Sequence, residues 1–144
     1  MGDLPEEVQE RVELLSHAGT AFETAGDFKN AVARYGAAFA LVPEPQTKWP
    51  VSAQILAKLG TSFYLSGDFQ AGADTLHLAL KCPTGSANPA IHLRLGQVEL
   101  ELDNRAAAIE HLTIAYQQEG AELFEPENPK YLAFLKTVRP ELVR

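Results

Sequence analysis

Apolar positions along most of the chain recur at intervals of three and four residues, which is the spacing of one face of an α-helix. Short segments rich in glycine, aspartate, asparagine or proline separate these stretches. Such residues end helices or form the turns between them. The pattern therefore predicts an all-α protein. Its expected helices span residues 5–25, 28–41, 51–66, 69–82, 89–102, 105–124 and 129–138.

The expected helices begin at residues that suit a helix N-terminus. Asp27 and Asn88 stand just before helices, where a side-chain oxygen can accept a hydrogen bond from a backbone N–H. Pro89 occupies a first helical position, where its missing N–H costs nothing. Asp3 is expected to cap the first helix. The sixth helix is expected to run past Gly120.

One residue pattern occurs three times in the chain. Aligning the sequence on Gly19, Gly60 and Gly96 places a large residue four positions before each glycine. In the first two copies an aromatic residue follows three positions later, and then a Gly-Asp turn. Small residues let paired helices approach closely, and large side chains fill the space around them. One helix pair cannot bury its own apolar face, whereas stacked pairs can.

This pattern resembles the tetratricopeptide repeat (TPR) family, in which Leu-Gly, aromatic and Ala positions recur over ~34 residues. The third copy departs most, since Glu99 replaces the aromatic residue and Gly120 stands where proline would be. The resemblance implies a single TPR domain over residues 1–144, folded as a right-handed α-solenoid of three helix pairs with a C-terminal capping helix. The repeats are expected at about 12–45, 53–86 and 89–120, and the cap at about 128–139.

The net charge of -7 restricts the partners that the protein could bind. Nucleic acid binding needs a basic surface, so this class of ligand is excluded. Acidic residues gather in the first helix and in the last third of the chain. They form either solvated faces or surfaces that attract a basic protein.

The sequence shows no sign of export or membrane insertion. No apolar run approaches the ~18 residues that a membrane span needs. The N-terminus is acidic, unlike a secretory signal, and Glu6 stands where myristoylation of Gly2 would need serine or threonine. The single cysteine, Cys82, excludes an internal disulfide and is expected to be a small buried thiol. We therefore expect a cytoplasmic protein.

No motif for catalysis or metal binding is evident. None of the four histidines has a second His, Cys or carboxylate at ligand spacing on one helical face. A phosphate-binding glycine loop and a Gly-x-Ser-x-Gly elbow are also missing from the sequence. We expect no enzyme, catalytic residue, cofactor or metal. Glu125 and Glu127 lie in a proline-rich segment and are expected to be solvated.

In the TPR family, the first helix of each pair lines a concave groove. The resemblance therefore implies that the protein binds a protein or peptide there, and we expect it to be monomeric or weakly dimeric alone. Tyr64 either contacts this partner or packs against the next helix, and Trp49 either covers the first repeat or is an exposed anchor. The expected groove residues are Thr20, Glu23, Gln54, Lys58, Thr61, Tyr64, Arg94 and Gln97.

Two comparisons within the family bear on the partner. Some members hold a C-terminal carboxylate with Lys, Asn and Arg, but Ser16 and Thr20 stand at two of these positions, so we expect no such clamp. Residues 88–97 and 124–136 are similar to small bacterial TPR proteins, some of which are thought to neutralise secreted toxins. An immunity partner is therefore an alternative to a general adaptor, and a self-assembling structural module is another. The similarity implies a surface at Asn88, His92, Arg94, Gln97, Lys130 and Tyr131.

Overall fold

The computed structural model describes residues 3–144, and no strand occurs among them. Our expectation that Gly2 is not myristoylated falls outside these residues. The α-helices are α1 (Glu6–Thr24), α2 (Phe28–Ala40), α3 (Pro50–Ser66), α4 (Phe69–Leu80), α5 (Pro89–Glu101), α6 (Arg105–Glu119) and α7 (Pro129–Val138). Three short 3-10 helices connect them: η1 (Gln46–Lys48), η2 (Gly85–Ala87) and η3 (Gly120–Phe124).

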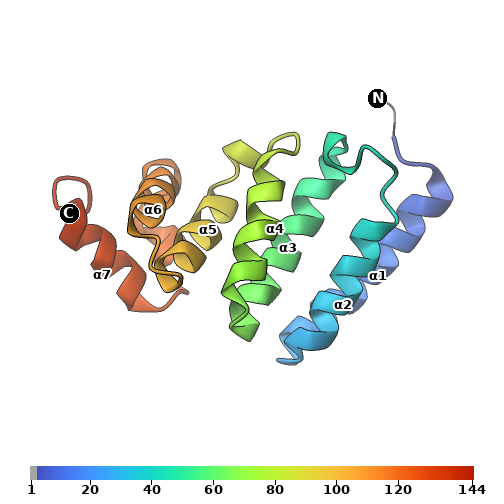
Figure 1. Cartoon of the computed structure of the whole chain (residues 1–144), viewed down its shortest axis with the longest axis horizontal. Helices are drawn as coiled ribbons and strands as arrows, with labels where there is room; N and C mark the ends of the chain where they lie inside the picture. The colour runs from blue at the N-terminus through green and yellow to red at the C-terminus, as the bar shows by residue number, and fades with distance from the viewer. Residues whose placement is uncertain (1–2) are drawn as a thin grey trace.

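The helices stack side by side in one extended row, with the N-terminus near one end and the C-terminus at the other (Figure 1). Consecutive helices α1 and α2, α3 and α4, and α5 and α6 form the closest pairs. Helix α2 packs on α3 and α4 packs on α5, which joins one pair to the next. The chain is therefore an all-α solenoid of three helix pairs, with α7 at its C-terminal end.

The turns inside the first two pairs end in side-chain caps, of which the one at Asp27 was predicted from the sequence. The side chain of Asp27 accepts a hydrogen bond from the backbone N–H of Asn30, and that of Asp68 accepts one from Ala71. Asn88 caps α5 by accepting from the backbone N–H of Ala90 at 2.9 Å. Our assignment of Asp3 as the first cap is wrong. Helix α1 begins after Pro5, two residues beyond Asp3, and it has no side-chain cap.

Each of the three aligned glycines faces a large side chain of the paired helix at close range. A Cβ atom on Gly60 would stand 2.5 Å from Cγ of Leu76, and one on Gly96 would stand 2.6 Å from Cγ of Leu112. At Gly19 the nearest atom, Cε1 of Tyr35, would be 2.7 Å away. Since real Cβ contacts are not this short, each of these positions requires glycine for the observed packing.

The core runs through all three pairs and ends under α7. Buried side chains from the C-terminal elements join those of α5 and α6 in one cluster, which includes Leu93, Leu112, Phe124, Tyr131, Leu135 and Val143. The structure corrects the expected length of the sixth helix. Helix α6 stops at Glu119 because Gly120 has a φ of 74°, and the chain continues as η3. Cys82 is buried, as expected, and burial raises the pKa of its thiol.

Candidate partner-binding groove

The expected groove residues separate into an open group and a closed group. On α1 and α3, Thr20, Gln54 and Lys58 are exposed, and Glu23 and Thr61 are half-buried. On α5, Gln97 is completely buried. The first two helix pairs therefore present these side chains to solvent, whereas the third pair does not.

Three adjoining hollows follow the line between α1 and α3. The middle hollow has a volume of about 190 Å³ and is lined by residues that include Glu13, Gln54 and Lys58. Lys58 also borders a hollow of about 200 Å³ that contains Glu23 and Thr61. Glu13 borders the third hollow, of about 270 Å³. Because neighbouring hollows share residues, they form one continuous surface, which we call the α1–α3 groove.

The third hollow is the most apolar part of the α1–α3 groove. Leu4, Val12, Trp49 and Val51 line it together with Asp3 and other residues. The indole Nε1 of Trp49 donates a hydrogen bond to the carbonyl oxygen of Pro43 at 2.9 Å, and its ring packs over the first pair's buried residues. Trp49 therefore covers the first repeat, and it also forms part of the hollow's wall.

Hydrogen bonds between helices hold the polar side chains of the groove in place. The Ser62 hydroxyl, which is buried on α3, donates to Oε1 of Glu23 on α1 at 2.8 Å. The hydroxyl groups of Thr20 and Tyr35 lie 2.9 Å apart, which joins α1 to α2. Within residues 3–144, neither Glu13 nor Lys58 forms an ion pair. These two charges remain able to bind a ligand.

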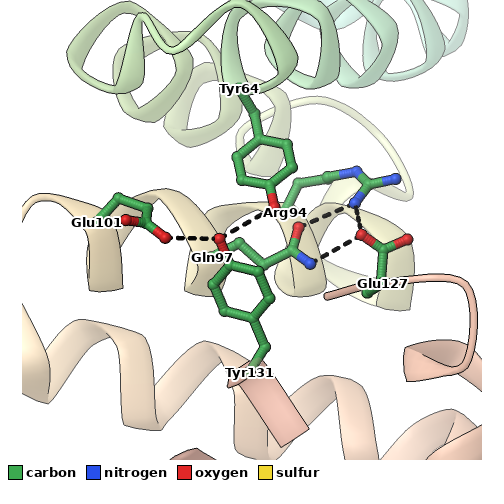
Figure 2. Close-up of polar contacts among 6 residues, drawn as sticks. All are labelled: Tyr64, Arg94, Gln97, Glu101, Glu127 and Tyr131. Carbon is green, nitrogen blue, oxygen red and sulfur yellow. Dashed lines mark hydrogen bonds and ion pairs between the residues drawn. The ribbon is translucent and has the colours of Figure 1, made fainter. Parts of the chain in front are cut away.

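The C-terminal segment closes the corresponding face of α5. The Arg94 guanidinium forms an ion pair with Glu127, and it donates a second hydrogen bond to Oε1 of Gln97 at 2.9 Å. The Gln97 amide donates in turn to Oε1 of Glu127 at 2.9 Å (Figure 2). Our expectation that Gln97 contacts a partner is therefore wrong for this arrangement. Glu125 is exposed, but Glu127 is not solvated as expected: its side chain is 12% exposed.

A chain of hydroxyl groups extends this closure toward α3. The Tyr64 hydroxyl donates to the Tyr131 hydroxyl at 3.0 Å, which donates to Oε1 of Glu101 at 2.7 Å (Figure 2). Burial, followed by these hydrogen bonds, raises the pKa of Tyr131. Burial alone would raise the pKa of Glu101, but hydrogen bonds from Lys130 and Tyr131 lower it overall. Tyr64 packs against Phe69 at the start of the next helix, α4, and against Tyr131 of α7, while a contact of Tyr64 with a partner stays a prediction.

The structure also corrects the candidate partner surface that was implied by similarity to small bacterial TPR proteins. His92, Gln97 and Tyr131 are 5%, 0% and 2% exposed, so three of the six residues are buried. Gln97 and Tyr131 make contacts with residues 30 positions away, Glu127 and Glu101, whereas His92 contacts His111 on α6 and Ser86. Sequence periodicity reports which face a residue occupies on its own helix. It contains no information on which later segment covers that face.

The structure brings the histidines of the second and third pairs closer than sequence spacing suggests. His92 on α5 and His111 on α6 have their Nδ1 atoms 3.0 Å apart, and His77 Nε2 lies 3.2 Å from Glu99 Oε1. Over the described residues, no group of three His, Cys, Asp or Glu side chains could hold a metal ion. No helix between residues 3 and 144 is both long and apolar enough to cross a membrane.

Comparison with known proteins identifies the fold. No protein-family model matches the chain, and no curated protein matches it in sequence. Among solved structures, the crystal structure of MamA is similar with a TM-score of 0.65. The similarity covers 90% of this chain and 77% of MamA, at 18% sequence identity. MamA is a TPR-like protein, and the chain thus has the fold of a TPR-type helical solenoid.

Proposed function

We propose that this protein is a non-catalytic interaction module that binds a segment of a protein partner in the α1–α3 groove. The observation that carries this proposal is the contrast between two parts of the same inner face. The side chains of α1 and α3 line open hollows, whereas those of α5 are engaged by Glu127 and Tyr131. A partner therefore contacts the first two helix pairs.

The charge of the groove favours a basic partner. The carboxylates of Asp3, Glu13 and Glu23 line the three hollows, and Lys58 is the single lysine or arginine among the lining residues. The whole chain carries a net charge of -7. Complementary charge speeds the encounter of two proteins and selects between partners.

The apolar hollow beside Trp49 supplies a second contact. Interface affinity usually depends on a few apolar or aromatic side chains that fill pockets, while charged groups at the rim provide selectivity. We propose that one large apolar side chain of the partner enters this hollow, and that basic residues next to it approach Glu13 and Glu23. Arg94 does not contribute a free positive charge, since Glu127 is its partner.

We further propose that residues 1–144 act as one domain of three repeats, as a cytoplasmic adaptor that is monomeric or weakly dimeric alone. An immunity partner for a toxin would use the same groove for one basic toxin. Gel filtration at two protein concentrations tests the alternative of self-assembly. A large oligomer that persists on dilution would contradict the adaptor hypothesis. In such an assembly the groove would have to bind the partner while the protein is already bound to other copies of itself.

Site-specific photocrosslinking tests the location of the binding surface. A benzoylphenylalanine at Gln54, in the groove, is expected to crosslink a partner in a lysate of the native organism. The same group at Ala33, which is exposed on α2, is the matched control. The crosslink at Gln54 is expected to weaken at ~0.5 M salt, where charges are screened within a few ångströms. Crosslinks at Ala33 alone would contradict the proposal.

A further inference from the structure

A buried pair of histidines joins the two helices of the third pair. His92 on α5 is 5% exposed and His111 on α6 is 8% exposed. Their ring planes are 23° from parallel with centroids 5.2 Å apart, and their Nδ1 atoms are 3.0 Å apart. This distance fits a single N–H···N hydrogen bond between the two helices.

The neighbouring carbonyl group fixes the position of each proton. His92 Nε2 lies 2.7 Å from the carbonyl oxygen of Ser86, which can only accept a hydrogen bond. Nε2 of His92 must therefore carry a proton, and in the neutral ring Nδ1 is then an acceptor. His111 must donate to it from its own Nδ1. The closed pair thus contains one proton between the two Nδ1 atoms.

The pair can hold only one additional proton without losing its hydrogen bond. A proton on Nε2 of His111 leaves the bond between the Nδ1 atoms in place. A second additional proton would put two N–H groups face to face at 3.0 Å, with two positive charges in buried positions. A solvated imidazole binds a proton with a pKa of about 6.5. At acidic pH, separation of α5 from α6 is therefore coupled to the uptake of protons by the histidine pair.

Burial and the neighbouring side chains also favour the neutral form of His111. Burial is the largest influence on His111 and lowers its pKa, and the neighbouring His92 lowers it further. His77 on α4 acts in the same direction, while Glu110 on α6 and Glu99 on α5 favour the proton without reversing the result. A histidine with a lowered pKa contributes stability that is complete above about pH 6.5 and declines as the pH falls below it.

The histidine pair is connected to the C-terminal closure through α5. Arg94 and Gln97, which hold Glu127, lie within two turns of His92 on this helix, and Glu101, which holds Tyr131, lies at its end. Movement of α5 away from α6 would disturb all of these contacts. Helices α1 and α3 are joined by the Ser62–Glu23 bond, which does not involve the third pair. One hydrogen bond, from Tyr64 to Tyr131, links α3 to the C-terminal segment, and its loss leaves the contacts between α1 and α3 in place.

We propose that the His92–His111 pair is an acid-sensitive joint, whose protonation separates α5 from α6 and loosens the C-terminal third of the solenoid. The first two helix pairs, with the α1–α3 groove, stay folded at the same pH. Acid thereby releases the C-terminal segment from the inner face of α5. This device is independent of which partner occupies the α1–α3 groove.

Hydrogen exchange of the full chain tests the joint. After correction for the intrinsic pH dependence of exchange, the opening constant of α5 and α6 is expected to rise by up to tenfold per pH unit, for each proton taken up, below about pH 6.5. Exchange in α1 to α3 is expected to change much less. Fluorescence of Trp49, the single tryptophan, reports on the first two pairs and should stay constant to about pH 5.

The variant His111→Asn isolates the pair. An asparagine amide can donate to His92 Nδ1 or, after rotation, accept from it, so the variant is expected to lose most of the pH dependence. His17→Asn, at an exposed position on α1, should behave like the unmodified protein. If His111→Asn fails to fold, His92→Gln provides the same comparison, because its amide can donate to Ser86. An unchanged pH dependence in the folded variant would overturn the proposal, as would uniform opening of all three pairs.

Discussion

At the scale of single residues, Glu125 and Glu127 show how much position in space decides the role of a side chain. Both carboxylates lie in the same proline-rich segment, two residues apart. Glu125 is exposed, while Glu127 accepts hydrogen bonds from Arg94 and Gln97. Removing one partner of an ion pair that is largely excluded from water costs more than removing one partner of an exposed pair, because the other charge is left unsatisfied.

The substitution Glu127→Gln is expected to lower the free energy of unfolding by about 1.5–3 kcal/mol, which is the usual range for hydrogen bonds to charged groups. Glu125→Gln makes an identical chemical change at an exposed site and should alter stability by less than about 0.5 kcal/mol. Urea denaturation followed by circular dichroism measures both. Equal effects of the two substitutions would show that the Arg94–Glu127 contact does not stabilise the fold.

At the scale of helices, Gly60 and Gly36 allow a matched comparison of the same substitution, one at a tightly packed site and one at an open site. Gly60→Ala places a Cβ atom 2.5 Å from Leu76, so overpacking should cost about 1–3 kcal/mol in the free energy of unfolding. Gly36, inside α2, has no atom within 4 Å of its Cβ position. Gly36→Ala should instead stabilise the protein by about 0.5–1 kcal/mol through helix propensity. Thermal denaturation distinguishes these signs, and a neutral Gly60→Ala would refute the close contact.

Helix placement was largely predictable from the sequence because it depends on neighbours along the chain. Turn residues such as Asp27 and Asn88 mark helix starts, and the observed α2, α3 and α5 begin within one residue of the predicted positions. Contacts between distant segments were not predictable in the same way. Nothing in the periodicity places Glu127 against Gln97, or His92 against His111, because each pair belongs to different elements.

At the scale of the whole molecule, the solenoid is unequal at its two ends. The N-terminal two pairs expose the α1–α3 groove, whereas the third pair is covered on its inner face and at its end by the segment from Gly120 onward. In a solenoid, each unit contacts mainly its neighbours, so stability is approximately a sum of local contributions and need not be lost in one step. The Tyr64–Tyr131 hydrogen bond is the contact that links α3 of the second pair directly to α7. The C-terminal part can therefore respond to changes that leave the groove unaffected.

Removal of residues 129–144 is expected to destabilise the third pair selectively. The truncation exposes the face that Tyr131, Leu135 and Val143 cover, and burial of each such side chain contributes about 1.5–3 kcal/mol. Urea should then unfold α5 and α6 at a lower concentration, seen as an early loss of helix by circular dichroism. Trp49 fluorescence should keep its original midpoint, because its neighbours Val12, Ala38 and Ile55 belong to the first two pairs. A parallel shift of both signals would mean that the three pairs unfold as one cooperative unit, and that the groove depends on the C-terminal cap.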